Sequence, residues 1–199
     1  AGACPEHPFV QGIATGQLQQ ATFAYYVGQD AFFLEAFARA YSICAAKAPN
    51  WQAFSQFHQL AAGVLSELQL HGEYARQWQV DLQAVTAGAA TQRYVDFLLA
   101  TAWGQPLGLT TVAMAPCMRL YAFLGERLAQ RTRSEAIQDH AYTDWIQTYS
   151  SDEFLALVQQ LEELVNQYAP QDDVAERAYR YAMQCELDFF QAAWEILTP

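Results

Sequence analysis

The feature that most constrains this chain is the spacing of its apolar residues, which recur about every 3.6 positions in every long segment. No segment alternates apolar and polar residues convincingly, as a half-buried strand would. We therefore predict an all-α protein, with breakers such as Pro49, Gly104 and Pro170 between its helices. The expected helices cover residues 18–48, 51–79, 90–103, 107–130, 136–147, 152–168 and 173–197.

Two of these helices begin with a capping signal. Ser150 stands three residues before Glu153, and Asp173 stands three residues before Glu176. In this arrangement the first side chain accepts a hydrogen bond from a free amide of the first turn, and the glutamate side chain can accept one from the amide of the capping residue. The spacing predicts N-caps at Ser150 and Asp173.

The composition favours one folded domain over residues 1–199, a single-domain helical bundle. Hydrophobic residues make up 53% of the chain and charged residues 16%, which is typical neither of a disordered chain nor of a solvated coiled coil. Aromatic residues reach 14%. A pocket lined by rings and an ordinary aromatic core both account for that share.

The charge balance excludes several classes of partner. The net charge is −11, and the 10 basic residues form no basic stripe, so we expect no binding to nucleic acid or to an anionic membrane surface. No uninterrupted apolar run approaches the roughly 20 residues that cross a bilayer. The four cysteines are widely spaced without a CxxC pair, which indicates free thiols in a reducing, cytoplasmic setting.

One predicted helix places a lone carboxylate on an aromatic face. Tyr26, Asp30, Phe33 and Phe37 share one side by helical spacing. A carboxylate that faces a core costs several kcal/mol (order of magnitude) unless it has a partner. Two interpretations stay open for Asp30: an ion pair or tyrosine hydrogen bond, and a carboxylate reserved for a ligand with N–H donors.

A proline beside a cysteine interrupts a second apolar helix. Pro116 cannot donate to the carbonyl of Val112, which predicts a kink that directs Cys117 toward a cavity. Tyr121 follows one turn later on the same face. A buried cysteine is more often an inert apolar residue than a nucleophile, and both interpretations remain open here.

The last helix carries a second lone carboxylate, Glu186, on a face with Tyr179, Met183 and Phe189. Burial would raise the pKa of Glu186 above its usual value, as a general acid near neutral pH requires. The alternative is a salt bridge to an arginine such as Arg119.

The remaining candidates are weaker. Tyr94 begins an apolar helix face, and Tyr149 ends a short helix where it can hydrogen-bond inward. Glu67 and His71 have a spacing that can bind metal, but a di-iron bundle needs further Glu and His ligands from other helices. We interpret them as a pair that is structural or that supports the site from behind its lining residues, and we expect neither a metal nor a cofactor.

Five segments, taken in order, resemble the TenA (thiaminase II) family, and the likeness runs from about residue 7 to residue 195. Cys117 points to the cysteine-bearing branch of that family. The segments are His7-Pro-Phe-Val10, Tyr25-Tyr-Val-Gly-Gln-Asp30, Pro116-Cys117-x-x-x-Tyr121, Trp145-Ile-x-Thr-Tyr149 and Cys185-Glu186-x-x-Phe189.

The resemblance implies a heme-oxygenase-like bundle, usually a homotetramer, with a deep pocket for a small pyrimidine. Such enzymes hydrolyse 4-amino-5-aminomethyl-2-methylpyrimidine to the hydroxymethyl pyrimidine, and also cleave thiamin. By position Cys117 matches the nucleophile, Glu186 the residue at the ring nitrogen, and Asp30 the carboxylate that holds the exocyclic amine and the thiol. Three tyrosines match the tyrosines of the family's pocket: Tyr94, Tyr121 and Tyr149. Phe33 and Phe189 match the rings that sandwich the pyrimidine.

Two departures from the family pattern bear on these expectations. Met118 and Arg119 follow the cysteine where the family often has aromatic residues, and only residues 1–6 precede His7, where the family usually has a helical segment. The alternatives to an aminopyrimidine hydrolase are a non-catalytic pyrimidine-binding protein and a metal-dependent oxidase, both on the same scaffold.

Overall fold

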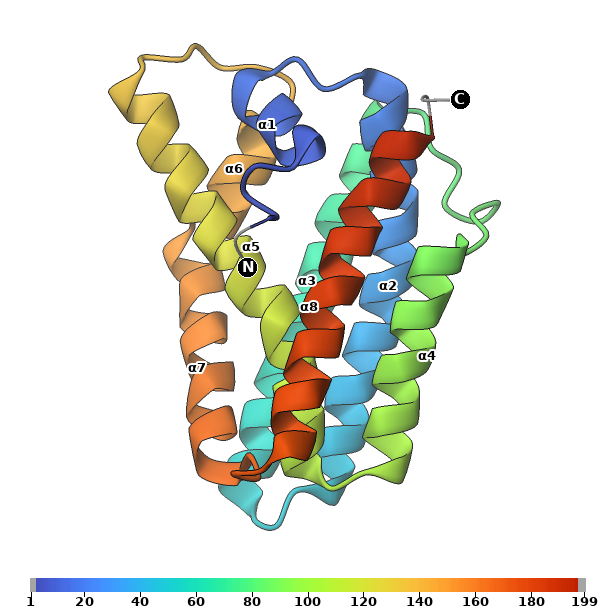
Figure 1. Ribbon diagram of the computed structural model, residues 1–199, viewed down its shortest axis with the longest axis vertical. Helices are drawn as coiled ribbons and strands as arrows, with labels where there is room; N and C mark the ends of the chain where they lie inside the picture. The colour runs from blue at the N-terminus through green and yellow to red at the C-terminus, as the bar shows by residue number, and fades with distance from the viewer. Residues whose placement is uncertain (1–2, 197–199) are drawn as a thin grey trace.

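The computed structural model describes residues 3–196, and in that range it contains helices and no strand (Figure 1). The predicted all-α class is therefore confirmed. The helices are α1 (Pro8–Thr15), α2 (Gln20–Lys47), α3 (Trp51–Gln77), α4 (Ala89–Gly104), α5 (Leu107–Ser134), α6 (Thr143–Tyr149), α7 (Asp152–Tyr168) and α8 (Asp173–Glu195).

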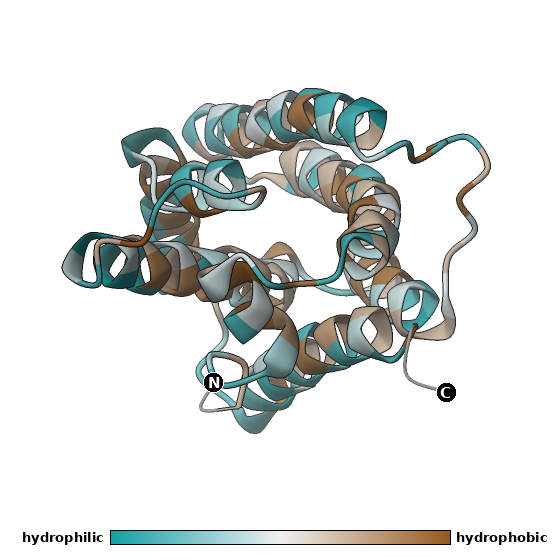
Figure 2. Cartoon of the chain, turned by 90° about the horizontal axis from the view of Figure 1, so that it is seen from above, coloured by the Kyte–Doolittle hydropathy of each residue, from teal (hydrophilic) through white to brown (hydrophobic). Residues whose placement is uncertain are grey.

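The long helices form an upright bundle, with α1 and α6 near one of its ends (Figure 1). Helix α2 packs against α3 and α4, while α5 packs against α7 and α8. Helix α2 also contacts α5 and α8, so these central helices share one core. Viewed from above, hydrophilic stretches gather on the outer sides of the helices (Figure 2). This is the arrangement that the apolar spacing predicts.

The predicted ends of the long helices lie within about two residues of the observed ones, except that α5 continues to Ser134 instead of ending at residue 130, and larger differences occur around the two short helices. Helix α1 was not predicted, because it has only two turns and is defined by local caps: the His7 side chain accepts from the amide of Phe9, and Gly16 ends the helix with φ of 71°. The predicted helix at 136–147 is wrong at its start. Residues 135–142 form a loop instead, with turns at 135–136 and 141–142; Ala136 has a positive φ, and the His140 side chain accepts from the amide of Tyr142. The predicted end of the last helix at residue 197 lies outside the described residues.

Both predicted N-caps are wrong by one residue. Ser151, not Ser150, caps α7 by accepting from the amide of Phe154. The Ser150 hydroxyl instead donates back to the carbonyl of Ile146 and closes α6. Asp172, not Asp173, caps α8. Adjacent Ser-Ser and Asp-Asp pairs offer two candidate caps that are one residue apart, and the spacing alone does not distinguish them.

Helix α5 is the core helix that carries the predicted nucleophile. It is the one described helix long and apolar enough to cross a membrane, yet 89% of that apolar window is buried inside the protein. Pro116 lies within α5, which continues on both sides of it. The kink expected there stays a prediction. Helix α5 brings Cys117 and Tyr121 to the centre of the bundle, between α2 and α8.

Candidate active site

A cavity lies in the core beside Cys117, between helices α2, α3, α5, α6 and α7. The empty space between its side chains is about 260 Å³, and the part wide enough for solvent has room for about one water molecule. The lining residues are Asp30, Leu34, Phe37, Glu67, Cys117, Met118, Tyr121, Tyr149 and Phe154. Four of the eight predicted site residues (Asp30, Cys117, Tyr121 and Tyr149) therefore line one cavity.

The thiol of Cys117 is buried among acidic groups. Its pKa is raised well above the usual value by burial first, and then by the nearby carboxyls of Glu186, Asp30 and Glu67. A hydrogen bond between Cys117 and Glu186 also favours the thiol over the thiolate. The resting site therefore holds a protonated thiol, and a thiolate has to form as the reaction proceeds.

Glu186 is a fully buried carboxyl with two polar contacts. The Tyr94 hydroxyl donates to Glu186 Oε1 over 2.7 Å, and the Cys117 side chain hydrogen-bonds to the same carboxyl. Burial raises the pKa of Glu186 to about 8, although these two hydrogen bonds act in the opposite direction. Glu186 is thus mostly a neutral acid at neutral pH, the form that a proton donor needs.

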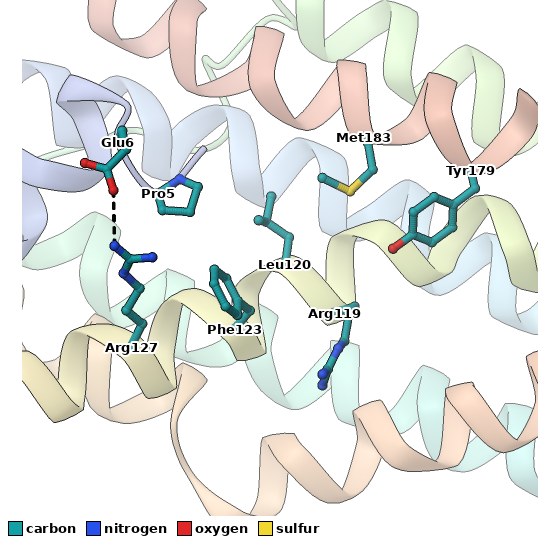
Figure 3. Close-up of a pocket in the computed structure, with 8 residues that line it drawn as sticks. All are labelled: Pro5, Glu6, Arg119, Leu120, Phe123, Arg127, Tyr179 and Met183. Carbon is teal, nitrogen blue, oxygen red and sulfur yellow. Dashed lines mark hydrogen bonds and ion pairs between the residues drawn. The ribbon is translucent and has the colours of Figure 1, made fainter. Parts of the chain in front are cut away.

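The alternative salt bridge between Glu186 and Arg119 does not occur. Arg119 instead lies 3.4 Å from Glu162, and both side chains are about half exposed. Figure 3 shows Arg119 at a surface groove together with Arg127, which pairs with Glu6. Of the two residues that depart from the family pattern, only Met118 reaches the cavity. Arg119 therefore adds no positive charge to the cavity wall.

Asp30 has both contacts of the first interpretation, a buried ion pair and a tyrosine hydrogen bond, although the sequence did not identify His71 as its ionic partner. His71 Nε2 lies 2.6 Å from Asp30 Oδ2, and His71 Nδ1 lies 3.1 Å from the backbone carbonyl of Glu67. Because both ring nitrogens face oxygen acceptors, His71 is held as an imidazolium. Burial lowers the pKa of His71, but Asp30 and Glu67 outweigh it and raise that pKa to about 9. Asp30 also accepts from the Tyr26 hydroxyl.

The same three residues have the composition of a metal site. Ligand atoms of Asp30, Glu67 and His71 lie within 4.8 Å of one another. A metal requires a deprotonated imidazole nitrogen, however, and both nitrogens of His71 are engaged with oxygen atoms. His71 is paired with Asp30, and it contacts Glu67 through the backbone carbonyl of that residue. Glu67 itself faces the cavity.

Three of the predicted substrate-binding residues do not line the cavity. Phe33 packs on Tyr94 with ring centroids 4.7 Å apart, and on Phe189 with centroids 6.1 Å apart. Together they form an aromatic layer beside Glu186, which Tyr94 contacts directly. The structure thus brings these three predicted residues together, but at the side of the cavity.

Sequence reasoning missed several lining residues. Phe37 shares the helix face of Asp30, so its position was signalled by helical spacing. Glu67 carried a signal too, through its spacing to His71, but its contact with the Tyr149 hydroxyl at 2.6 Å depends on the packing of α3 against distant segments. Phe154 at the start of α7 gave no local signal.

Folding stability is expected to fall as the pH rises from about 6 to 9. The pKa values of Glu67 (about 7), Glu186 (about 8) and His71 (about 9) all exceed their ordinary values of 4.5, 4.5 and 6.5, so the folded protein holds more protons than the unfolded chain in this window. Each group contributes a slope of up to about 1.4 kcal/mol per pH unit. Urea unfolding at pH 6, 7.5 and 9 measures the effect. A flatter slope is expected for Glu186→Gln, and a free energy of unfolding that rises with pH in the wild-type protein would contradict the prediction.

Gly125 of α5 lies against the backbone at the end of helix α6. A Cβ atom at this position would clash with the backbone carbonyl of Tyr149. We expect Gly125→Ala to destabilise the fold by about 1–3 kcal/mol through overpacking, although alanine usually favours a helix. Thermal unfolding measures this. The matched control is Gly72→Ala on α3, where a Cβ meets nothing within 4 Å, and equal stability of the two variants would refute the steric explanation.

Comparison with known proteins places the chain among relatives of one family. The profile of the TENA/THI-4/PQQC family matches residues 1–196. The chain is 35% identical over 209 residues to the mitochondrial bifunctional TH2 protein of Arabidopsis thaliana, covering 93% of this chain and 34% of that protein. It is 30% identical over 161 residues to the aminopyrimidine aminohydrolase of Helicobacter pylori, covering 79% of this chain and 73% of that enzyme.

Solved structures give the same result for the fold. A TenA family transcription regulator from Silicibacter sp. TM1040 superposes with a TM-score of 0.88 at 25% identity, covering 100% of this chain and 91% of that one. The TenA homologue of P. horikoshii OT3 has a TM-score of 0.87 at 26% identity, with 96% and 90% covered. These likenesses confirm the expected heme-oxygenase-like fold. The chain spans about a third or less of the length of the first curated relatives that it matches.

Proposed function

Because this chain belongs to the TENA/THI-4/PQQC family, we propose that it is a hydrolase of thiamin-related aminopyrimidines. The specific reaction is conversion of 4-amino-5-aminomethyl-2-methylpyrimidine and water to 4-amino-5-hydroxymethyl-2-methylpyrimidine and ammonia, with cleavage of thiamin as a second activity. The observation that carries this proposal is the Cys117 thiol hydrogen-bonded to the neutral acid Glu186 beside an aromatic cavity. Relatives of about 30% identity are named aminopyrimidine aminohydrolase, which supports the same reaction class.

The first half of the proposed reaction adds the thiol to the ring. Glu186 donates its proton to the ring nitrogen N1, which makes C6 electrophilic. The sulfur of Cys117 bonds to C6 while the thiol proton passes to Asp30. Asp30 is suited to this role because it shares the cavity with Cys117 and its charge already acts on that thiol.

The second half replaces the substituent. Loss of aromaticity lets the ring electrons expel the group on the exocyclic methylene, as ammonia or as thiazole. Water then adds to that carbon, and the proton that it loses replaces the one that the departing amine takes up to leave as ammonia; in thiamin cleavage, where the thiazole takes up no proton, this proton goes to solvent. The bond between Cys117 and C6 breaks, the sulfur regains its proton from Asp30, and the proton on N1 returns to Glu186. One difficult displacement becomes two easier steps through a covalent intermediate.

The aromatic residues are proposed to hold the ring. Phe33 and Phe189 would stack on its faces, and the hydroxyls of Tyr94, Tyr121 and Tyr149 would bind its edge together with Asp30. Since the empty cavity has room for about one water molecule, the ring has to displace side chains as it enters. The aromatic layer of Phe33, Tyr94 and Phe189 would then become part of the wall.

A homotetramer and a cytoplasmic location belong to the same proposal. The four cysteines are free and buried, as expected for a protein of a reducing compartment.

A single-turnover assay tests the proposed function. Excess protein is mixed with the aminomethyl pyrimidine or with thiamin, and both pyrimidine products and ammonia are measured by chromatography. We expect hydroxymethyl pyrimidine and ammonia in equal amounts from the first substrate. Tight binding by calorimetry without any product would overturn the proposal in favour of a non-catalytic pyrimidine-binding protein.

A further inference from the structure

Glu67 is a cavity-lining carboxyl that the reaction above does not use. It lies on α3, one turn before His71, and is partly buried. Among the described residues, its one side-chain hydrogen bond is with the hydroxyl of Tyr149, which donates to Glu67 Oε1 over 2.6 Å. The Glu67 side chain therefore has a defined orientation, and it lines the same cavity as Cys117.

The neighbouring ion pair leaves Glu67 free to change its protonation state. His71 is already matched with Asp30, at 2.6 Å, so Glu67 is not needed to neutralise it. Burial raises the pKa of Glu67 to about 7, while the charge of His71 lowers it, Asp30 raises it and the Tyr149 hydrogen bond lowers it. Near neutral pH, acid and carboxylate forms of Glu67 are both populated.

The thiol thus has two carboxyl–tyrosine pairs near it, from different helices. Glu186 on α8 is bonded by Tyr94 and touches the thiol itself, whereas Glu67 on α3 is bonded by Tyr149 and borders the empty space. The reaction has two sites of proton transfer, the ring nitrogen and the exocyclic substituent. If Glu186 serves the ring nitrogen, the second site has no proton donor or acceptor yet.

We propose that Glu67 is that second acid–base residue, acting at the exocyclic substituent of the pyrimidine. This rests on the proposed function. As the acid, Glu67 gives its proton to the amine while the C–N bond breaks, and ammonia leaves. As the carboxylate, it then accepts a proton from water while the C–O bond forms, so Glu67 ends in the form in which it began. The thiazole of thiamin leaves as a neutral molecule and needs no proton from the protein.

The different leaving groups provide the test. In single-turnover experiments, Glu67→Gln is expected to slow ammonia release from the aminomethyl pyrimidine about a hundredfold, within the usual range for general acid catalysis. Thiazole release from thiamin should change less than about threefold. The matched control is Glu73→Gln, an exposed glutamate on the same helix, which should leave both rates unchanged. Equal losses on both substrates would mean a merely structural role and would overturn the inference.

A second variant keeps the inference testable should Glu67→Gln fold poorly or thiamin react too slowly. Glu67→Ala leaves space for a small carboxylic acid, and formate is expected to restore ammonia release at least about tenfold. Absence of rescue in a folded Glu67→Ala protein would overturn the inference. An inactive wild-type protein would instead reject the proposed function itself.

The pH dependence adds an independent readout. Ammonia release by the wild-type protein should show a step near pH 7 that thiazole release lacks. Titratable groups that interact electrostatically with Glu67 come from four helices, and Tyr121 on α5 lines the same cavity. They are Tyr26, Asp30 and Tyr41 on α2, His71 and Tyr74 on α3, Cys117 on α5, and Tyr149 on α6. Loss of the step in Glu67→Gln assigns it to Glu67, and its persistence in that variant would overturn the assignment.

Discussion

Replacement of Cys117 by serine is expected to reduce release of hydroxymethyl pyrimidine by at least about a thousandfold. The serine hydroxyl is close in size to the thiol, so the packing of α5 changes little. Its pKa is far higher than that of a thiol, however, and the same burial and acidic neighbours oppose ionisation. Single-turnover product formation measures the loss, and circular dichroism with thermal unfolding shows that the fold is kept.

Cys44→Ser is the matched control for this prediction. Cys44 is a buried cysteine of α2 that lies outside the cavity and has a side-chain hydrogen bond with Thr110, which a serine can replace. We expect normal turnover from this variant. Full activity of Cys117→Ser, or equal losses in the two variants, would remove Cys117 from the proposed reaction.

Glu186→Gln should lower turnover by about a hundredfold or more, since general acid catalysis contributes about 10²–10⁴. The amide matches the carboxylic acid in shape and can still accept from Tyr94, but it cannot deliver a proton to the ring. In the wild-type protein the acid form exists below the pKa of about 8. Turnover should therefore fall as the pH rises through 8, and this limb should be absent from the residual activity of Glu186→Gln.

Glu162→Gln is a suitable control, because Glu162 is a half-exposed glutamate that pairs with Arg119 at the surface. Its turnover and its pH profile should match those of the wild-type protein. The proposed role of Glu186 fails if Glu186→Gln keeps full turnover. It also fails if the alkaline limb persists unchanged in that variant.

The electrostatics of the site explain why both effects are expected to be large. Burial raises the pKa of Glu67 and Glu186, and acidic neighbours raise the pKa of His71, so the resting site stores protons near neutral pH. Within residues 3–196, the one buried cation that faces this cluster is His71, and it is matched with Asp30. A site of this kind does not hold a preformed thiolate. It is suited to reactions in which a proton reaches the substrate as the sulfur attacks.

Much of the fold could be predicted from the sequence, because helix formation follows from the local spacing of apolar residues. The 152–168 helix was predicted to the residue, and the long helices α2 to α5 were found with shifted ends. The short helix α1 and the turn before α6 were missed. Both depend on single caps such as His7 and Gly16, which carry little periodic signal.

The candidate site could be predicted from the sequence only in part. Asp30, Cys117 and Glu186 stood out because a polar or reactive side chain on an apolar helix face has to be explained. Their ordered neighbours also identified the family. Spacing within one helix left open whether Arg119 pairs with Glu186, whereas in the structure it pairs with Glu162, and it could not place Phe33 and Phe189 relative to the cavity.

By itself, the sequence determined the helical class, the family and the identity of the buried thiol and carboxyls, because these depend on residue type and on spacing within one helix. Only the tertiary structure decided that His71 neutralises Asp30 from 41 positions away, and that Tyr149 orients Glu67 from 82 positions away. Those contacts depend on which helix faces meet, and this is set by the packing of the whole core. The protonation states of the site follow from that packing, since burial and neighbouring charges, not residue type, shift each pKa.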